Sequence, residues 1–427
     1  MSLSWFSIVR LGLVQMALGS IVVLTTSTLN RLMVVELALP AVLPGLLVAL
    51  HYGIQITRPN WGFLSDQGNH RTRWIIGGMA VLGAGALLAA TAIPLFETSF
   101  LAGLAISIVA YALIGLGVGA SGTSLLALLA TATHPRRRAA AATITWLMMI
   151  FGIAVTAATV GSFLDPYSHA LLLRIVAVVV VGAVLLTSIA VVGIERGVEE
   201  RPEPDRMSFR DGLAEIWAET RARNFTIFVF LSMTAFFMQE LILEPYAGLV
   251  FGFTPGESTS LSGAQNGGVF VGMLIVGVAG TGFRIGSLRN WVFAGCVGSA
   301  CALTIISVIG FMGMPVLLPA VVGLGVFNGM FAVAAIGSMM ALASDGRHGR
   351  EGTRMGLWGA AQAIAAGFGG LVGAASVDVL RQMTDTTTAF GTVFLGEALI
   401  FIAAAIMALR IIDGAPSASG ATLVPGE

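Results

Sequence analysis

The sequence predicts an all-α membrane protein with twelve transmembrane helices arranged as two halves of six. Of its 427 residues, 56% are apolar and only 10% are charged, and the mean hydropathy is +0.92. Such a chain has too little polar surface to cover a water-soluble globule. Gly, Pro and charged clusters divide it into twelve apolar runs of about 20 residues, the length that crosses a bilayer. The longest hydrophilic stretch follows the sixth run.

The twelve runs set the expected spans. These are residues 11–29, 37–57, 74–94, 101–131, 139–163, 170–193, 225–250, 260–281, 291–311, 315–342, 354–380 and 389–412. The chain has 54 glycines, as expected where helices approach closely in lipid. It has no lysine, which excludes Schiff-base and P-loop lysine chemistry. The two cysteines, Cys296 and Cys301, share one apolar run, which excludes a disulfide framework and favours core positions.

The hydrophilic stretch divides the chain into four expected parts. They are an N-terminal six-helix half at 1–193, a linker at 194–224, a C-terminal six-helix half at 225–413 and a disordered cytoplasmic tail at 414–427. Two six-helix halves joined by a cytoplasmic loop is the plan of the major facilitator superfamily. Short cytoplasmic loops of membrane proteins are rich in positive charge. If the N-terminus is cytoplasmic, all arginines except Arg31, Arg174 and Arg381 lie on the cytoplasmic side, so both termini are predicted to be cytoplasmic.

The second part of the linker predicts an amphipathic helix on the membrane surface. Ser208 is followed three residues later by Asp211, a capping-box spacing, and apolar residues then recur at helical intervals. The apolar positions are Phe209, Leu213, Ile216 and Trp217. This helix either ties the two halves together or provides a docking face for a partner enzyme.

The loop between the second and third spans reads GFLSDQGNHRTR over residues 62–73. It resembles the facilitator pattern in which G-x-L-[SA]-D precedes a glycine and a basic cluster. A carboxylate at a helix end or beside an arginine can lock a cytoplasmic gate. The gate residues predicted here are Gly62, Asp66, Gly68, Arg71 and Arg73. The equivalent loop of the second half, GTGFRIGSLR at 280–289, has no Asp, so that half is expected to lack the latch.

Two features of drug and proton antiporters are missing. The fourth span has no arginine before Gly115 and Gly119, and the fifth span has no Gly-Pro motif. Proton-driven drug efflux is therefore disfavoured. The spacing of Gly115 and Gly119 favours helix packing over binding.

Ionisable and polar residues within the spans indicate where a substrate could bind, because burying them in lipid is costly. Clusters occur at matching outer ends of the two halves, and they either line a pocket or lie at the headgroup level. The expected pocket residues are Asn30, Arg31, Glu36, His51, Gln55, Gln239, Glu240, Glu244, Tyr246, Gln265 and Asn266. Arg31 is expected to pair with Glu36 or with an acid of the other cluster.

His51 and Gln55 share one helix face, since they are four residues apart. A neutral imidazole can bind the magnesium of a chlorin, although a lone intramembrane histidine is more often a hydrogen-bonded interior residue. No grouping of His, Cys, Asp and Glu has the spacing of a metal enzyme, and no catalytic triad, dinucleotide fingerprint or Walker loop is present. We therefore expect neither a catalytic site nor a protein-bound metal.

Three segments resemble the bacteriochlorophyll delivery family, the PucC-like branch of the major facilitators. They are TLNRLMVVEL at 28–37, PAVLPGLLVALHY at 40–52 and QELILEPYAGLVFG at 239–252, and the resemblance extends over essentially all twelve spans. The short termini and the compact length look closer to the subgroup that accompanies pigment-synthesis genes. The resemblance implies a multi-pass protein of the bacterial cytoplasmic, intracytoplasmic photosynthetic membrane.

The resemblance also implies a function in photosynthesis. The chain would be a non-enzymatic accessory factor that binds or hands over bacteriochlorophyll or a chlorophyllide-type magnesium tetrapyrrole, in pigment synthesis or light-harvesting assembly. Its expected partners are membrane lipid, the pigment, a late pathway enzyme such as chlorophyll synthase or geranylgeranyl reductase, or light-harvesting apoproteins, and no nucleic acid. His51 or Asn30 would contact the magnesium or the ring. Two alternatives are an alternating-access transporter of a small amphipathic solute and a pigment-free scaffold for a pathway enzyme.

Overall fold

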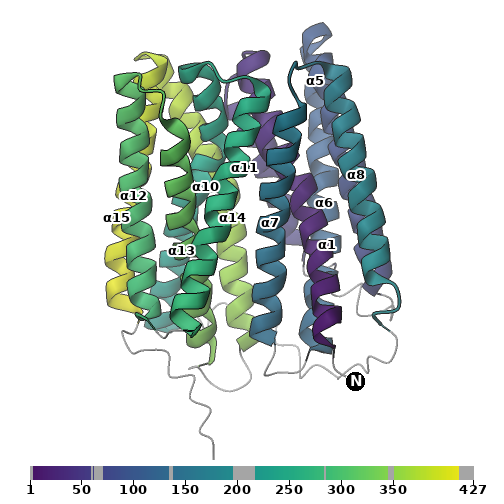
Figure 1. The fold of residues 1–427 in the computed structure, drawn as a ribbon, viewed down its shortest axis with the longest axis vertical. Helices are drawn as coiled ribbons and strands as arrows, with labels where there is room; N and C mark the ends of the chain where they lie inside the picture. The colour runs from purple at the N-terminus through teal and green to yellow at the C-terminus, as the bar shows by residue number, and fades with distance from the viewer. Residues whose placement is uncertain are drawn as a thin grey trace, which may run out of the picture.

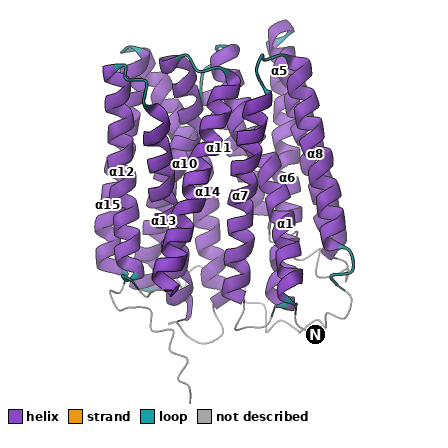
Figure 2. Ribbon diagram, in the orientation of Figure 1, coloured by secondary structure: helices purple, strands orange, loops and turns teal. Residues whose placement is uncertain are grey.

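The computed structural model describes residues 3–58, 61, 71–133, 138–195, 217–282, 285–344 and 351–412. Every regular element within these residues is helical (Figure 2). Among the described residues, eleven long helices and one shorter helix run alternately up and down, with those of the first half on one side of the bundle and those of the second half on the other (Figure 1). The helices of the first half are α1 (Trp5–Val23) continued by η1 (Leu24–Thr28), α2 (Leu29–Arg31) and η2 (Leu32–Glu36); α3 (Val42–Ile54) continued by η3 (Gln55–Thr57); α5 (Arg71–Thr98); α6 (Phe100–Ala132); α7 (Arg138–Phe163); and α8 (His169–Val191). Those of the second half are α10 (Thr220–Phe251), α11 (Pro255–Val276) continued by η5 (Gly277–Gly282), α12 (Leu288–Met312), α13 (Leu317–Ser344), α14 (Glu351–Arg381) and α15 (Thr386–Ile411).

The predicted count of twelve spans is confirmed in the described residues, although one helix is short. Eleven helices are long and apolar enough to cross a membrane, and the second, Val42–Thr57, is a shorter apolar helix. The first helix is longer than the expected 11–29, because it runs from Trp5 to Glu36 through two π-helical segments. No Gly or Pro interrupts residues 29–36, so the helix continues past residue 29. It ends before Ala38, whose φ of 50° turns the chain.

Each half has its own apolar core. One cluster of buried side chains draws on residues 3–194 with Leu241 added, and the other draws on residues 225–412. The halves meet where α7 packs against α11 and α3 against α14. At the first contact Gly161 lies against the backbone of Gly256 and Ser260, and a Cβ at Gly161 would overlap them. Small residues thus allow the two halves to touch backbone to backbone.

The helix ends follow the expected capping chemistry. Thr254 forms a complete capping box with Glu257 at the start of α11, and Ser168 caps α8. Asp385 caps α15, and its bonds from Thr388 hold the pKa of the Asp385 carboxyl below its ordinary value.

Glu397 of α15 is a buried carboxyl outside the candidate cavity described below. Its exposed fraction is 0%, and neither carboxyl oxygen has a hydrogen-bond partner in the part of the chain that the structure describes. An unsatisfied buried polar group costs about 1–3 kcal/mol. We therefore expect Glu397→Leu to raise the thermal unfolding midpoint of the detergent-purified protein, and Glu397→Gln to leave it unchanged or raise it. Glu97→Gln at an exposed position is the control, and lower midpoints in both Glu397 variants would contradict this account.

Candidate functional site

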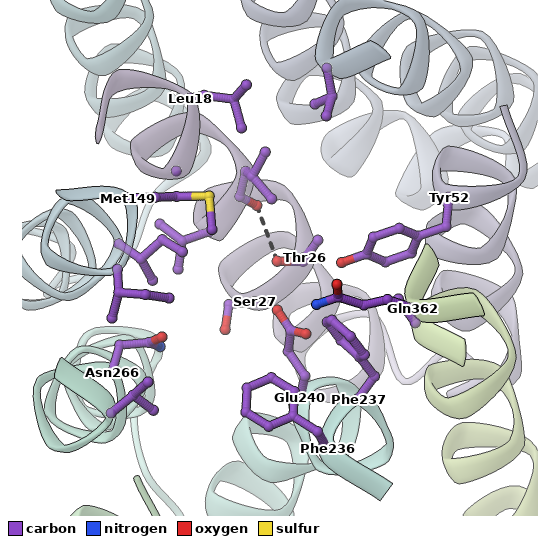
Figure 3. Close-up of a pocket in the computed structure, with 18 of the residues that line it drawn as sticks. Leu18, Thr26, Ser27, Tyr52, Met149, Phe236, Phe237, Glu240, Asn266 and Gln362 are labelled. Atoms are coloured by element: carbon purple, nitrogen blue, oxygen red, sulfur yellow. Dashed lines mark hydrogen bonds between the residues drawn. The ribbon is translucent and has the colours of Figure 1, made fainter. Parts of the chain in front are cut away.

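A cavity of about 370 Å³ lies between the two halves. Helices of both halves line it, and most of its lining side chains are apolar (Figure 3). Its polar lining residues are Gln15, Thr26, Ser27, His51, Tyr52, Gln55, Arg58, Gln239, Glu240, Glu244, Ser262, Gln265, Asn266 and Gln362. An apolar cavity with a small number of polar groups is the usual form of a small-molecule site.

The π-helical segment η1 brings polar side chains of the first helix to the cavity. Thr26 donates to the carbonyl of Val22 at 3.1 Å, a bond drawn in Figure 3. Ser27 points across the interface and bonds Ser262 of α11, with 3.0 Å between their Oγ atoms. A π-helical segment widens the helix and changes the direction of the side chains that follow, and such segments are frequent at functional sites.

Two carboxyl groups from α10 face the cavity. Glu240 and Glu244 are four residues apart and therefore lie on the same side of the helix. Glu244 is buried beside the hydroxyls of Ser27 and Ser262, and neither of its oxygens makes a hydrogen bond within the described residues. In Figure 3 the carboxyl group of Glu240 points to the same central space as the amide of Gln362 and the hydroxyl of Tyr52. These groups can accept hydrogen bonds from a ligand or offer hard oxygen atoms to a cation.

A chain of hydrogen bonds fixes the orientation of His51. Arg58 donates through Nη2 to Oε1 of Gln55, so the amide nitrogen of Gln55 faces His51. Gln55 Nε2 lies 3.0 Å from His51 Nε2, which must therefore accept, and the ring proton lies on Nδ1. His51 Nδ1 is buried and has no hydrogen-bond partner among the described residues. His51 is thus arranged as a hydrogen-bond donor through Nδ1, and its Nε2 lone pair is occupied.

Aromatic rings from both halves meet at the cavity wall. Tyr52 of α3 contacts Phe237 of α10 edge to face, with 5.8 Å between ring centroids. Phe237 in turn contacts Phe236 at 5.2 Å. This wall gives a flat aromatic ligand a surface against which to pack.

Seven of the eleven predicted pocket residues line this cavity. They are His51, Gln55, Gln239, Glu240, Glu244, Gln265 and Asn266. The structure places the other four elsewhere. Tyr246 is buried in the core of the second half, where its hydroxyl donates to the carbonyl of Ile306 at 2.9 Å.

Asn30, Arg31 and Glu36 form contacts on the distal face, by which we mean the side opposite the N-terminus, where the first helix ends at Glu36 and α7 ends at Phe163 (Figure 1). Arg31 donates to Glu36 at 2.5 Å, the predicted pairing, and to the carbonyl of Phe253 at 2.7 Å. Asn30 donates to the carbonyl of Leu241 at 2.7 Å. Asn30 and Arg31 thus join the two halves, Glu36 contacts Arg31 within the first half, and none of the three lines the cavity.

Two carboxylates that sequence reasoning did not select also join the halves on the distal face. Asp378 accepts from the backbone N–H groups of Ala41 and Val42 at 3.0 and 2.6 Å, at the start of α3. Asp165 accepts from Thr254 Oγ1 at 2.6 Å and from Gly256 N at 3.2 Å, at the start of α11. Nothing in the sequence pattern indicated the partners of either carboxylate.

The gate motif and the predicted docking helix are each described only in part. Gly62, Asp66 and Gly68 of the gate motif lie outside the described residues, while Arg71 and Arg73 begin α5. Of the predicted docking helix, Phe209, Leu213 and Ile216 lie outside the described residues. Trp217 is described and is 49% exposed.

The two glycines predicted to serve packing do so. A Cβ at Gly115 would overlap the carbonyl oxygen of His51, and one at Gly119 would press on Trp61. Gly115 thereby allows α6 to pack closely against α3. The position of His51 at the cavity depends on that close approach.

Comparison with solved structures establishes the fold. The nucleoside transporter NupG, in a crystal structure of a point mutant, superimposes with a TM-score of 0.69 over 95% of this chain and 100% of that chain, at 14% identity. The predicted major facilitator fold is therefore confirmed.

Comparison of sequences identifies the family. The family model described as PUCC protein matches residues 28–415, which is most of the chain. The chain belongs to the PUCC protein family. This PUCC member is 64% identical over 428 residues to the "Bacteriochlorophyll synthase 44.5 kDa chain" of Rhodobacter capsulatus, covering 100% of both chains. It is 30% identical over 396 residues to "Protein PucC" of Cereibacter sphaeroides, covering 88% of this chain and 84% of that one.

Proposed function

We propose that this multi-pass membrane protein is an accessory factor of photosynthesis that binds or hands over bacteriochlorophyll or a precursor. In doing so it would support pigment synthesis or light-harvesting assembly. The name of the 64% identical relative supports a link to bacteriochlorophyll. The observation that carries the proposal is the cavity between the halves, which has an aromatic wall and a few polar lining groups.

The chemistry of the cavity suits a magnesium tetrapyrrole. Such a ring is flat and largely apolar, with carbonyl groups at its edge and a hard cation at its centre. The ring would pack against Tyr52 and Phe237, and His51 Nδ1–H would donate to a ring carbonyl. A carboxyl oxygen of Glu240 or Glu244 suits magnesium better than His51 Nε2, whose lone pair already accepts from Gln55.

We assign no catalytic step to this chain. Among the described residues no group of three or more His, Cys, Asp and Glu side chains could hold a metal ion. The word synthase belongs to the name of the relative, and the chemistry would be that of a partner such as chlorophyll synthase or geranylgeranyl reductase. The exposed Trp217, which precedes α10, belongs to the segment proposed to dock that partner or a light-harvesting apoprotein.

Purification in mild detergent from a pigment-making host tests the proposal. We expect absorption bands of a bound chlorin, and at least a roughly tenfold loss of pigment per protein in Glu244→Ala, because a buried hydrogen bond or ligand contact is removed. His51→Ala should reduce pigment as well. Glu97→Gln, at an exposed position outside the cavity, should retain it. A colourless wild-type protein that carries a pathway enzyme would contradict pigment binding and favour the scaffold.

A second candidate function is alternating-access transport of a small amphipathic solute. The closure of the distal face by Arg31, Asp165 and Asp378 above a cavity between the halves favours it. Substrate-dependent flux in proteoliposomes by a colourless protein would support this function over the accessory role.

A further inference from the structure

Arg58 is the one arginine or lysine among the described residues that line the cavity. It directly follows Thr57 at the end of η3, and its side chain is held by the bond to Gln55. The Nε atom of Arg58 is buried and has no hydrogen-bond partner among the described residues. Among the described residues no carboxylate lies within 4.0 Å of the guanidinium. The cavity therefore contains a cation that the described protein does not neutralise.

A guanidinium with no counter-ion among the described residues requires an explanation. It stays charged in proteins, and removing a charge from water without a counter-ion is unfavourable. The carboxyl end of a helix favours a cation, which accounts for an arginine after η3 but supplies no counter-ion for Arg58. A ligand carboxylate would supply this counter-ion, because the planar fork of guanidinium donors matches two carboxylate oxygens.

The size of the cavity favours a compact ligand. Its volume of about 370 Å³ is near the lower end of the roughly 300–1,000 Å³ of ligand sites. A long isoprenoid tail would have to extend beyond it. Esterification of a tetrapyrrole also removes the negative charge that Arg58 could bind.

We infer that the cavity prefers the free-acid form of the tetrapyrrole, with the ring carboxylate bound by Arg58, over the esterified form. The two acids of α10, Glu240 and Glu244, would then meet the uncharged part of the ring from the other half. This inference rests on the proposed function and names its substrate class. The reaction that consumes the ligand would then be an esterification by a partner.

Binding of two matched probes tests the inference. The probes are bacteriochlorophyllide and its methyl ester, which share one ring and differ in charge without adding a tail. Each is titrated into the full-length purified protein in nanodiscs, and binding is followed by quenching of tryptophan fluorescence. We expect the acid to bind at least roughly tenfold more tightly, as a charge-assisted hydrogen bond allows. In Arg58→Gln this preference should fall to about twofold or less, whereas Arg58→Lys should keep part of it.

Arg410→Gln, an exposed change at the end of α15, is the control and should keep the full preference. Equal binding of acid and ester by the wild type would overturn the inference while leaving the proposed function intact. A preference that persists in folded Arg58→Gln would overturn the assignment to Arg58. The comparison of acid and ester binding uses only the wild-type protein. It therefore tests the inference even if Arg58→Gln does not fold. Binding of neither probe by the wild type would contradict the proposed function itself.

Discussion

The double variant Asp165→Ala, Asp378→Ala is expected to open the distal face. Each carboxylate accepts two hydrogen bonds at the start of a helix in the opposite half, Asp378 on α3 and Asp165 on α11. Hydrogen bonds to a charged group contribute about 1.5–3 kcal/mol, and Asp165 is exposed, so its share is at the lower end. Loss of about 3 kcal/mol in total would change the open population by roughly 100-fold.

The positions of the two carboxylates support this prediction. Asp378 lies near the end of α14, the fifth helix of the second half, and binds the start of α3, the second helix of the first half. Asp165 follows α7, the fifth helix of the first half, and binds the start of α11, the second helix of the other half. The two contacts are thus related by the repeat of the halves. Internal repeats of this kind underlie rocking of one half against the other.

Labelling of a cavity cysteine measures the opening. Cys296→Ala and Cys301→Ser remove the native thiols, and Asn266→Cys places one in the cavity. A membrane-impermeant maleimide added from the distal side should label the double variant at least roughly tenfold faster than its parent. The matched control is Asp385→Ala, which removes an N-cap of α15 without touching the first half. Equal acceleration in that control would show that general loosening, and not the contact between halves, exposes the cavity.

The sequence predicted which segments are helical better than it predicted where each helix ends or which of its residues face the cavity. Apolar runs identify spans because the backbone must satisfy its hydrogen bonds internally in lipid. The end of the first helix was misplaced, since the polar residues Asn30 and Arg31 suggested a membrane boundary. They are instead buried in a continuous helix and bond the carbonyls of Leu241 and Phe253.

The candidate site could be predicted only in part, for a related reason. Glu240, Glu244 and His51 stand out because ionisable residues within spans are rare. Glu397 is equally rare but is buried in the core of its own half, outside the cavity. The difference depends on how each helix is rotated against its neighbours. Arg58 directly follows the expected second span at 37–57, and only the fold shows that it lines the cavity.

Gly272→Leu is expected to abolish most of the folded protein. In the structure α11 and α13 touch backbone to backbone: a Cβ at Gly272 would overlap the carbonyl of Val326, and one at Gly329 would overlap that of Val269. A flexible side chain could move away from the added Cβ, but the backbone of a packed helix cannot. Overpacking typically costs 1–3 kcal/mol, and with backbone on the other side we expect about 3 kcal/mol or more. The yield of monodisperse protein and its thermal midpoint measure the loss.

The same helix provides a matched control for this prediction. Gly267 lies five residues earlier on α11, where a Cβ would meet nothing within 4 Å. Gly267→Leu should therefore keep its folded yield, although both variants place the same side chain on the same helix. The smaller change Gly272→Ala should leave some folded protein but shift α11. Because Gln265 and Asn266 of α11 line the cavity, this protein should bind less pigment than wild type. Equal losses at positions 267 and 272 would mean that leucine disturbs α11 wherever it is placed, and that the close approach to α13 is not what requires glycine.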